Sequence, residues 1–230
     1  MIKHIFLDLD DTILDFKKGE RLAIRKTLDM LGIKSDDRII ERYMEINISC
    51  WRALERKEMT RDQVLYGRFE RLFKELSVEE DPVATQKLYQ DLLSREHDFL
   101  PGGKELLEDL KAEGKYSLYI ATNGIPEVQN PRIKDSGIKE YFNNIFISYD
   151  FGFGKPSREF FDRCFERIEG FKKEECIIVG DSLTSDIKGG INAGIKSCHF
   201  NPKDTPYDDI IPDYKITDLS QLIPLLDSIE

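Results

Sequence analysis

A short apolar run near the start of the chain constrains the fold most. The run, Ile5–Leu9, is typical of a strand buried on both faces, as in a parallel sheet. Carboxylates gather at its end, where Asp8 and Asp10 alternate with Leu7 and Leu9, and Asp11 follows. In an extended chain the side chains at positions 8 and 10 point the same way, roughly 7 Å apart. Open α/β sheets bind ligands at this end of their strands, so the sequence predicts a ligand crevice here. The alternative is that Asp10, Asp11 and Thr12 only begin a turn or cap a helix.

Strands and helices alternate along the second half of the chain. Apolar runs that fit strands lie at residues 116–121, 144–148, 176–179, 196–200 and 214–216, with helical patterns between them. This alternation predicts an α/β fold with a doubly wound parallel sheet. Residues 17–98 instead show helical spacing of apolar side chains and no convincing strand. We therefore expect an α/β core at 1–16 and 99–230, interrupted by an inserted helical bundle at 17–98.

Composition narrows the possible partners and location. The net charge of -10 over 230 residues argues against nucleic acid polymers and anionic membranes as partners. An anionic substrate must then be attracted by local positive charge or by a metal. The four cysteines show no Cys-x-x-Cys spacing and are expected to be buried free thiols in a reducing compartment. No apolar run approaches the length of a membrane span, and the first run turns acidic too early for a signal peptide, so a cytoplasmic location is expected.

Four polar fragments follow strands or open helices on what is expected to be one edge of the sheet. They are Asp8–Thr12, Thr122–Gly124, Gly154–Pro156 and Gly180–Asp186. Each alone has an ordinary structural explanation as a turn, a solvated loop or a helix cap. Their joint occurrence in this order favours a single site.

The acidic members of these fragments predict a metal. Asp8, Asp10, Asp181 and Asp186 gathered in one crevice repel one another, and a pair at 4 Å feels about 4 kcal/mol at an effective dielectric constant of 20. Such a cluster either takes up protons or binds a hard cation. Oxygen ligands alone favour Mg²⁺, which keeps several waters and leaves room for a substrate phosphate.

The remaining polar residues complete a set for phosphoryl transfer. Lys155 could bridge a carboxylate and a phosphoryl oxygen, Thr122 offers a hydroxyl, and the amides around Asn123 offer donors for an anion. In this hypothesis Asp8 attacks phosphorus and forms an aspartyl-phosphate. Asp10 protonates the leaving oxygen and then deprotonates the water that breaks the intermediate.

The four fragments resemble the four motifs of the haloacid dehalogenase (HAD) superfamily. The resemblance implies that Asp8 is the nucleophile and Asp10 the acid/base, and it assigns Thr122 and Lys155 to the second and third motifs. It also implies a metal bound by the carboxylates of Asp8 and Asp181 and by the backbone carbonyl of Asp10. In this arrangement Asp186 orients Lys155 or a metal-bound water. The helical insertion resembles the C1 cap of the family, which closes over the site and selects the substrate.

Longer fragments resemble the pyrimidine 5′-nucleotidase branch of this superfamily. They are Asp8–Phe16, Ile120–Ile125, Tyr141–Ser148, Gly180–Ile195 and His199–Pro202, with Trp51–Leu54 and Thr60–Arg61 in the cap. The resemblance implies a small-molecule phosphate monoester as substrate, a pyrimidine nucleoside monophosphate in particular. One departure is Pro131, which predicts that the helix after the second motif begins late or is kinked.

Other functions share parts of this pattern. A phosphatase or phosphomutase acting on a small sugar phosphate uses the same catalytic residues. A metal-independent haloacid dehalogenase also uses an aspartate nucleophile, but it leaves Asp10 without a task. A non-catalytic binding module is a further alternative, although Asp8, Asp10 and Lys155 are all retained. Candidate substrate contacts in the helical segment are Phe16, Asn47, Trp51 and Arg52, with core packing favoured for Asn47 and Trp51.

Overall fold

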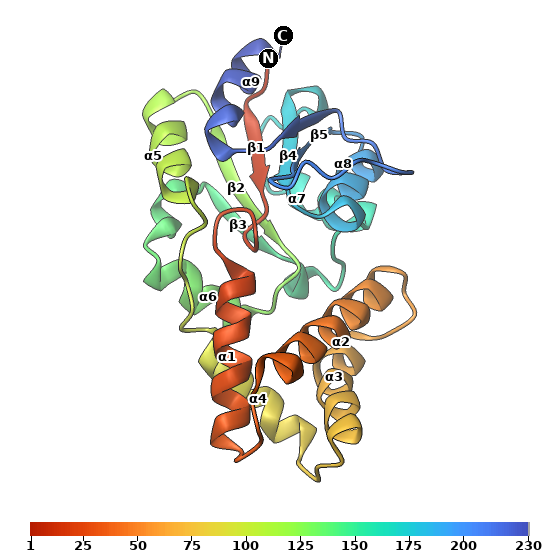
Figure 1. Cartoon of the computed structure of the whole chain (residues 1–230). Coiled ribbons are helices and arrows are strands. Elements are labelled where there is room, and N and C mark those ends of the chain that lie inside the picture. Colours follow the sequence, from red (N-terminus) through yellow and green to blue (C-terminus); the bar gives the residue numbers. More distant parts are fainter. Residues whose placement is uncertain (230) are drawn as a thin grey trace. The chain divides into compact units, whose positions relative to one another are not determined.

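The computed structural model describes residues 1–229, which form two compact units. The described part of the α/β unit consists of residues 1–15, 98–126 and 133–229. The helical unit consists of Phe16–His97 and Glu127–Arg132 (Figure 1).

The α/β unit is built on a six-stranded sheet in the order β3-β2-β1-β4-β5-β6, and every neighbouring pair is parallel. The strands begin and end close to the predicted runs, which confirms the doubly wound parallel sheet. Figure 1 shows β1 at the centre of this sheet. The strands are β1 His4–Leu7, β2 Ser117–Thr122, β3 Asn144–Ile147, β4 Cys176–Gly180, β5 Lys196–Phe200 and β6 Tyr214–Ile216.

Helices cover both faces of the sheet because successive residues of each strand point to opposite sides. In β1, Ile5 and Leu7 pack into a cluster with the helices α5 (Gly103–Glu113) and α9 (Leu222–Ser228). Phe6 points the other way, into an aromatic cluster with α7 (Arg158–Phe165) and α8 (Lys188–Ala193). The central strands are thus buried on both sides, as their continuous apolar sequence predicts.

Two helical segments differ in detail from the sequence predictions. Helix α6 runs without interruption over Pro126–Asp135 with Pro131 inside it, so the prediction of a late start is wrong. Proline lacks the N–H of an ordinary helical bond, but its φ angle suits a helix, and the remaining residues keep the helical conformation. Before α8, the chain makes a π-helical turn at Leu183–Ile187. The sequence pattern predicted neither feature.

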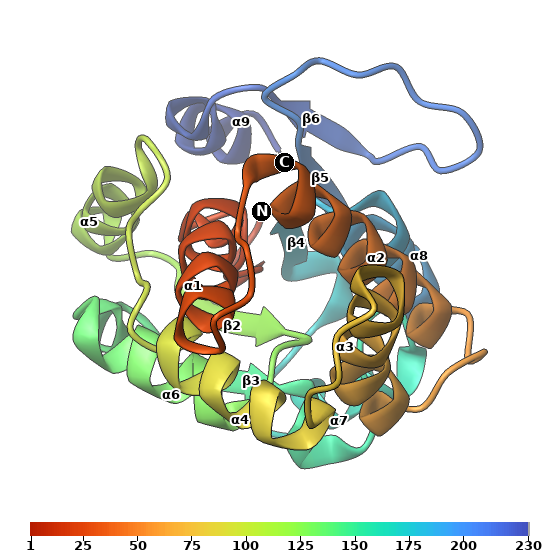
Figure 2. The ribbon, with the colours of Figure 1, turned by 60° about the horizontal axis from the view of Figure 1, so that its bottom comes forward.

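The helical unit contains four main helices, seen in red to yellow in Figure 2. Three of the four begin with a side-chain cap, since Asp36, Thr60 and Asp81 each accept a bond from a backbone N–H of the helix that follows. Residues 16–97 contain no strand, in agreement with the predicted bundle. The helices are α1 Phe16–Met30, α2 Asp37–Glu55, α3 Arg61–Leu76 and α4 Pro82–Leu93.

A buried polar network, here called the Arg68 cluster, links these four helices. The Arg68 guanidinium donates to Asn47 Oδ1 and to Gln86 Oε1, each at 2.7 Å, and lies over the Tyr89 ring at 4.8 Å from its centroid. Asn47 Nδ2 donates to Glu20 Oε1 at 2.6 Å, and Tyr89 Oη donates to the same oxygen at 3.3 Å. Both charged members are almost fully buried. The core interpretation of Asn47 is therefore confirmed.

All four cysteines are buried free thiols, as predicted. Within residues 1–229, no helix combines the length and apolar character needed to cross a bilayer.

Candidate active site

The chain turns sharply after β1 and brings the first acidic motif to the end of the sheet. The backbone N–H of Asp8 still donates to Val179 of β4 at 2.9 Å, so this residue is held by the sheet. Beyond it, the N–H groups of Ile13 and Leu14 both donate to the Leu9 carbonyl. Asp11 has a φ of 56°, in the left-handed region that aspartate tolerates better than most residues. The turn that was the alternative explanation for Asp10, Asp11 and Thr12 is therefore present, and Asp8 next to it is buried.

Lys155 joins two acidic motifs that lie far apart in the sequence. Its Nζ donates to Asp8 Oδ1 at 2.7 Å and to Asp186 Oδ1 at 2.6 Å, and all three side chains are buried. The two ion pairs link residues from the first, third and fourth fragments. These fragments meet at the carboxyl end of the sheet, where the sequence predicts a site.

Asp186 is fixed by local structure as well as by Lys155. Its second oxygen, Oδ2, accepts a bond from the Ser182 N–H at 3.0 Å. A Cβ on Gly180 would overlap the Asp186 carboxylate, so only glycine at this position allows the carboxylate to lie against the end of β4. Gly180 therefore allows the turn between β4 and the π-helical segment to place the Asp186 side chain at the end of the strand.

Charge in the cluster is unbalanced. One carboxylate oxygen from each of Asp8, Asp181 and Asp186 lies within 4.8 Å of the other two, and together with Lys155 we call these residues the strand-end cluster. Burial and, to a smaller extent, the nearby Asp186 charge raise the pKa of Asp8 to about 8, although Lys155 opposes the rise. Burial alone lowers the pKa of Lys155, but Asp186 and Asp8 raise it by more, so this pKa lies above its ordinary value. One ammonium group thus faces an excess of carboxylate.

These residues fit a magnesium ion. The three carboxylates supply hard oxygen ligands, and their spacing allows one atom from each to contact a single cation. The oxygens of Asp186 are already bonded to Lys155 and to the Ser182 N–H. Asp8 and Asp181 are therefore the better candidates for direct ligands, and Asp186 remains a candidate for orienting Lys155. The assignment of the Asp10 carbonyl to the metal stays a prediction. A divalent ion here adds the positive charge that the cluster lacks.

The Asn123 side chain holds the backbone of Lys155. Its side chain accepts a bond from the Lys155 N–H at 2.8 Å and donates to the Lys155 carbonyl at 2.7 Å. It also donates to Ser185 Oγ at 3.2 Å. A Cβ on Gly154 would lie 2.6 Å from Asn123 Oδ1, so glycine is needed beside the clamp. The side chain thus positions Lys155, and anion binding by the neighbouring amides stays a prediction.

Thr122 ends β2 at the same edge of the sheet. It is buried, and its hydroxyl oxygen accepts a bond from the Gly124 N–H at 3.1 Å. This bond shapes the turn after β2 and fixes the position of the hydroxyl. Its contact with a substrate phosphate stays a prediction.

His199 and Tyr207 were not predicted to take part in the site, yet His199 contacts Asp181 and Tyr207 contacts His199. His199 Nε2 lies 2.8 Å from the backbone oxygen of Asp181, and His199 Nδ1 lies 3.1 Å from Tyr207 Oη. The strand register could have indicated His199, because this residue pairs with Gly180, which immediately precedes Asp181.

The fold agrees with comparisons with known proteins. A family model described as haloacid dehalogenase-like hydrolase matches residues 2–194. The chain belongs to this hydrolase family. Resemblance of the four motifs to the HAD superfamily is thereby confirmed.

Three relatives of this HAD-like hydrolase are informative. YfnB, a HAD-family protein of Bacillus subtilis, is 41% identical over 97% of this chain and 95% of its own length. Its crystal structure, which contains magnesium, matches with a TM-score of 0.93 at 40% identity and covers 98% of this chain and 99% of YfnB. PynA, a pyrimidine 5′-nucleotidase of Streptococcus pneumoniae, is 35% identical over 98% of this chain and 95% of its own. A glyceraldehyde 3-phosphate phosphatase of Pyrococcus furiosus is 30% identical over 98% and 93% of the two chains.

Proposed function

We propose that this HAD-like hydrolase is a Mg²⁺-dependent phosphomonoesterase that dephosphorylates pyrimidine nucleoside monophosphates through an aspartyl-phosphate. The observation that carries the proposal is the strand-end cluster. A buried lysine is bonded to Asp8 and Asp186, and Asp181 lies within reach of the same cation. This arrangement offers a nucleophile, a fixed positive charge and a cation site in one place.

The proposed reaction has two displacements at phosphorus. An Asp8 carboxylate oxygen forms a bond to phosphorus while the ester oxygen leaves with the electron pair and takes a proton from Asp10. Asp10, now ionised, accepts a proton from water, and the resulting oxygen attacks the phosphorus of the aspartyl-phosphate. The bond to Asp8 breaks, and inorganic phosphate and the starting carboxylate are formed.

The fixed groups of the site stabilise the charge that develops. Lys155 is held by Asn123 through its backbone and by Asp186 through its ammonium, so it needs little reorganisation during the reaction. Mg²⁺ held by the carboxylates would supply further positive charge to stabilise the transferring phosphoryl group. Thr122 is proposed to donate its hydroxyl to one of these oxygens.

The similarity to PynA over nearly the whole chain supports a pyrimidine nucleotide as substrate. The similarity to the Pyrococcus phosphatase favours a small sugar phosphate as a second candidate. Both need the same catalytic residues, so the helical unit is proposed to decide between them. Dehalogenation is less well supported, because a departing halide needs no proton from Asp10.

Phosphate release with a panel of substrates tests the proposal. Pyrimidine and purine monophosphates, glyceraldehyde 3-phosphate and hexose phosphates are assayed with Mg²⁺ and with EDTA. We expect Mg²⁺-dependent release with preference for pyrimidine monophosphates. Preference for the sugar phosphates would refute the nucleotidase assignment but keep the mechanism. Absence of metal-dependent release from every substrate would refute both.

A further inference from the structure

We propose that His199 and Tyr207 form a hydrogen-bonded relay that positions Asp181 for metal binding. The inference rests on the proposed function only in taking Asp181 as a metal ligand. It adds two positioning residues, one of them in the loop between β5 and β6, to the strand-end cluster.

The first step is the bond between His199 and Asp181. His199 is the fourth residue of β5, and it pairs with Gly180, the last residue of β4. Its ring therefore reaches the peptide that immediately follows β4. A carbonyl oxygen only accepts hydrogen bonds, so the 2.8 Å contact requires that His199 Nε2 carries the proton.

The second step fixes the ring from its other side. With the proton on Nε2, the neutral Nδ1 is an acceptor, and Tyr207 Oη at 3.1 Å is its donor. The two rings also pack together, with centroids 5.5 Å apart. Tyr207 thus selects the tautomer that donates to Asp181.

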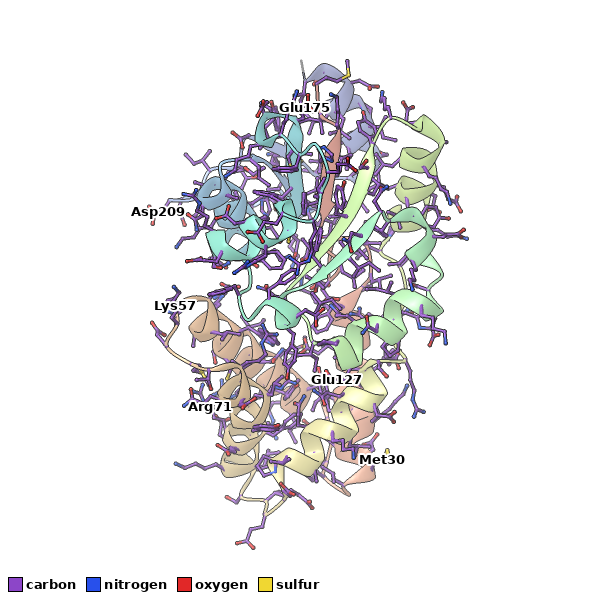
Figure 3. All side chains as sticks on the ribbon, turned by 180° about the vertical axis from the view of Figure 1, so that it is seen from behind. Met30, Lys57, Arg71, Glu127, Glu175 and Asp209 are labelled. Atoms are coloured by element: carbon purple, nitrogen blue, oxygen red, sulfur yellow. The ribbon has the colours of Figure 1, made fainter. Side chains whose placement is uncertain are left out.

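The third step anchors Tyr207. It lies in the loop between β5 and β6, drawn in blue at the upper right of Figure 2. Asn201 closes the base of this loop, because its side chain donates to the Thr205 carbonyl at 2.8 Å and accepts from the Thr205 N–H at 3.1 Å. Lys215 of β6 forms an ion pair with Asp204 in the same loop. Further out, Asp209 is exposed at the edge of the α/β unit (Figure 3).

The consequence concerns the Asp181 carboxylate. A carboxylate that follows the end of a strand takes its direction from the backbone that carries it. The bond to His199 fixes that backbone at the point where the side chain must lie within 4.8 Å of the Asp8 and Asp186 oxygens. Loss of a group that orients a metal ligand typically weakens metal binding by roughly 10- to 100-fold.

The chain offers a matched control in His4. This histidine is also buried, it begins β1 at the end of the strand away from the site, and its Nδ1 lies 3.2 Å from Tyr119 Oη. His4→Phe and His199→Phe therefore each remove a buried histidine that contacts a tyrosine. A loss of general packing affects both variants alike, whereas a positioning role affects only His199→Phe.

Calorimetric titration with MgCl₂ tests the relay without measuring activity. Wild type, His199→Phe, His199→Gln, Tyr207→Phe and His4→Phe are compared, with thermal unfolding in EDTA as the measure of folding. We expect His199→Phe to weaken Mg²⁺ binding roughly 10-fold, the lower end of the range for such groups. His199→Gln should recover most of the affinity, since its amide can donate to the Asp181 carbonyl. Tyr207→Phe should show a smaller loss, and His4→Phe none.

Three results would overturn the relay. They are wild-type affinity in His199→Phe, an equal loss in His4→Phe, or a His199→Gln variant as weak as His199→Phe. If His199→Phe does not fold, the relay is tested by the Mg²⁺ affinities of His199→Gln and Tyr207→Phe, each compared with that of His4→Phe. A wild-type protein that binds no Mg²⁺ would refute the proposed function together with the relay, whereas a wild-type protein that binds Mg²⁺ no better than His199→Phe would refute the relay alone.

Discussion

The two units of this protein each bury charged side chains, but they balance the charge differently. In the Arg68 cluster of the helical unit, the buried arginine is bonded to two amide oxygens, and Asn47 links it to the buried Glu20. In the strand-end cluster of the α/β unit, the Lys155 ammonium contacts Asp8 and Asp186 directly, and Asp181 adds a further carboxylate. One network distributes charge through neutral amides, and the other concentrates negative charge at one point.

The difference indicates which network carries out chemistry. Buried charges that are bridged by hydrogen bonds hold elements together and need no ligand. Buried carboxylates that outnumber their cation leave negative charge uncompensated. A divalent ion can neutralise this charge and at the same time bind a phosphoryl group. We therefore expect changes in the strand-end cluster to affect turnover and changes in the Arg68 cluster to affect stability.

Replacement of the nucleophile should give the largest effect. Asp8→Asn keeps the shape of the side chain but removes the attacking oxygen, so turnover should fall on the order of 10⁴-fold or more. The free energy of unfolding in EDTA should not fall, because the substitution relieves repulsion from Asp186. Initial-rate assays and urea denaturation measure the two quantities. Asp109→Asn on the exposed face of α5 is the matched control and should behave as wild type.

Removal of the lysine should affect both quantities. Lys155→Met leaves Asp8 and Asp186 buried without their shared ammonium, which should cost about 3–5 kcal/mol of stability. Turnover should fall roughly 10²–10³-fold, as for the loss of one group that stabilises the transition state. Urea denaturation with and without Mg²⁺ and steady-state kinetics measure these effects. A Lys155→Met variant with wild-type kcat would contradict the role of the strand-end cluster.

Disruption of the Arg68 cluster should change the stability of the protein and leave its turnover unchanged. Arg68→Met leaves Glu20 and two amides without their cation, and the free energy of unfolding should fall by about 3 kcal/mol. The kcat of the folded variant should be unchanged. Hydrogen exchange over α1–α4, together with kinetics, checks this expectation. Arg71→Met is the control, since Arg71 is exposed on the same helix (Figure 3). A loss of kcat as large as that of Lys155→Met would remove the distinction between the clusters.

Two glycine substitutions provide the smallest and sharpest contrast. A Cβ on Gly180 displaces Asp186, so Gly180→Ala should lower both turnover and stability. A Cβ on Gly67, within α3, meets only the Met59 side chain at 3.7 Å. Gly67→Ala should therefore stabilise the protein by roughly 0.5–1 kcal/mol and leave turnover unchanged. Thermal unfolding and phosphate release of both variants test this pair. Equal effects would show that Asp186 tolerates displacement.

The sequence was most informative where a buried strand ends in polar residues. Because parallel strands end at a common edge, Asp8, Lys155 and Asp186 could be expected to meet before their contacts were seen. The preference for core packing of Asn47 over a substrate contact was also correct, since this side chain is buried. These predictions needed only periodicity and the geometry of a parallel sheet.

Other features depend on side-chain direction, which periodicity does not encode. Asn123 clamps the Lys155 backbone, a task that needs the exact spacing of two loops. The partners of Arg68 come from other helices, so no local pattern reveals them. In the sequence His199 is an ordinary strand residue, and only the register of β4 and β5 shows that it lies beside Asp181.

Detection of a covalent intermediate on Asp8 tests the central claim most directly. The enzyme is mixed with excess substrate and Mg²⁺, quenched in acid within the first turnover, digested and examined by mass spectrometry. The proposed mechanism predicts a phosphate adduct on the peptide that contains Asp8, absent in EDTA and absent in Asp8→Asn. Full turnover by Asp8→Asn, or an adduct on a different residue, would contradict the assignment of Asp8 as the nucleophile.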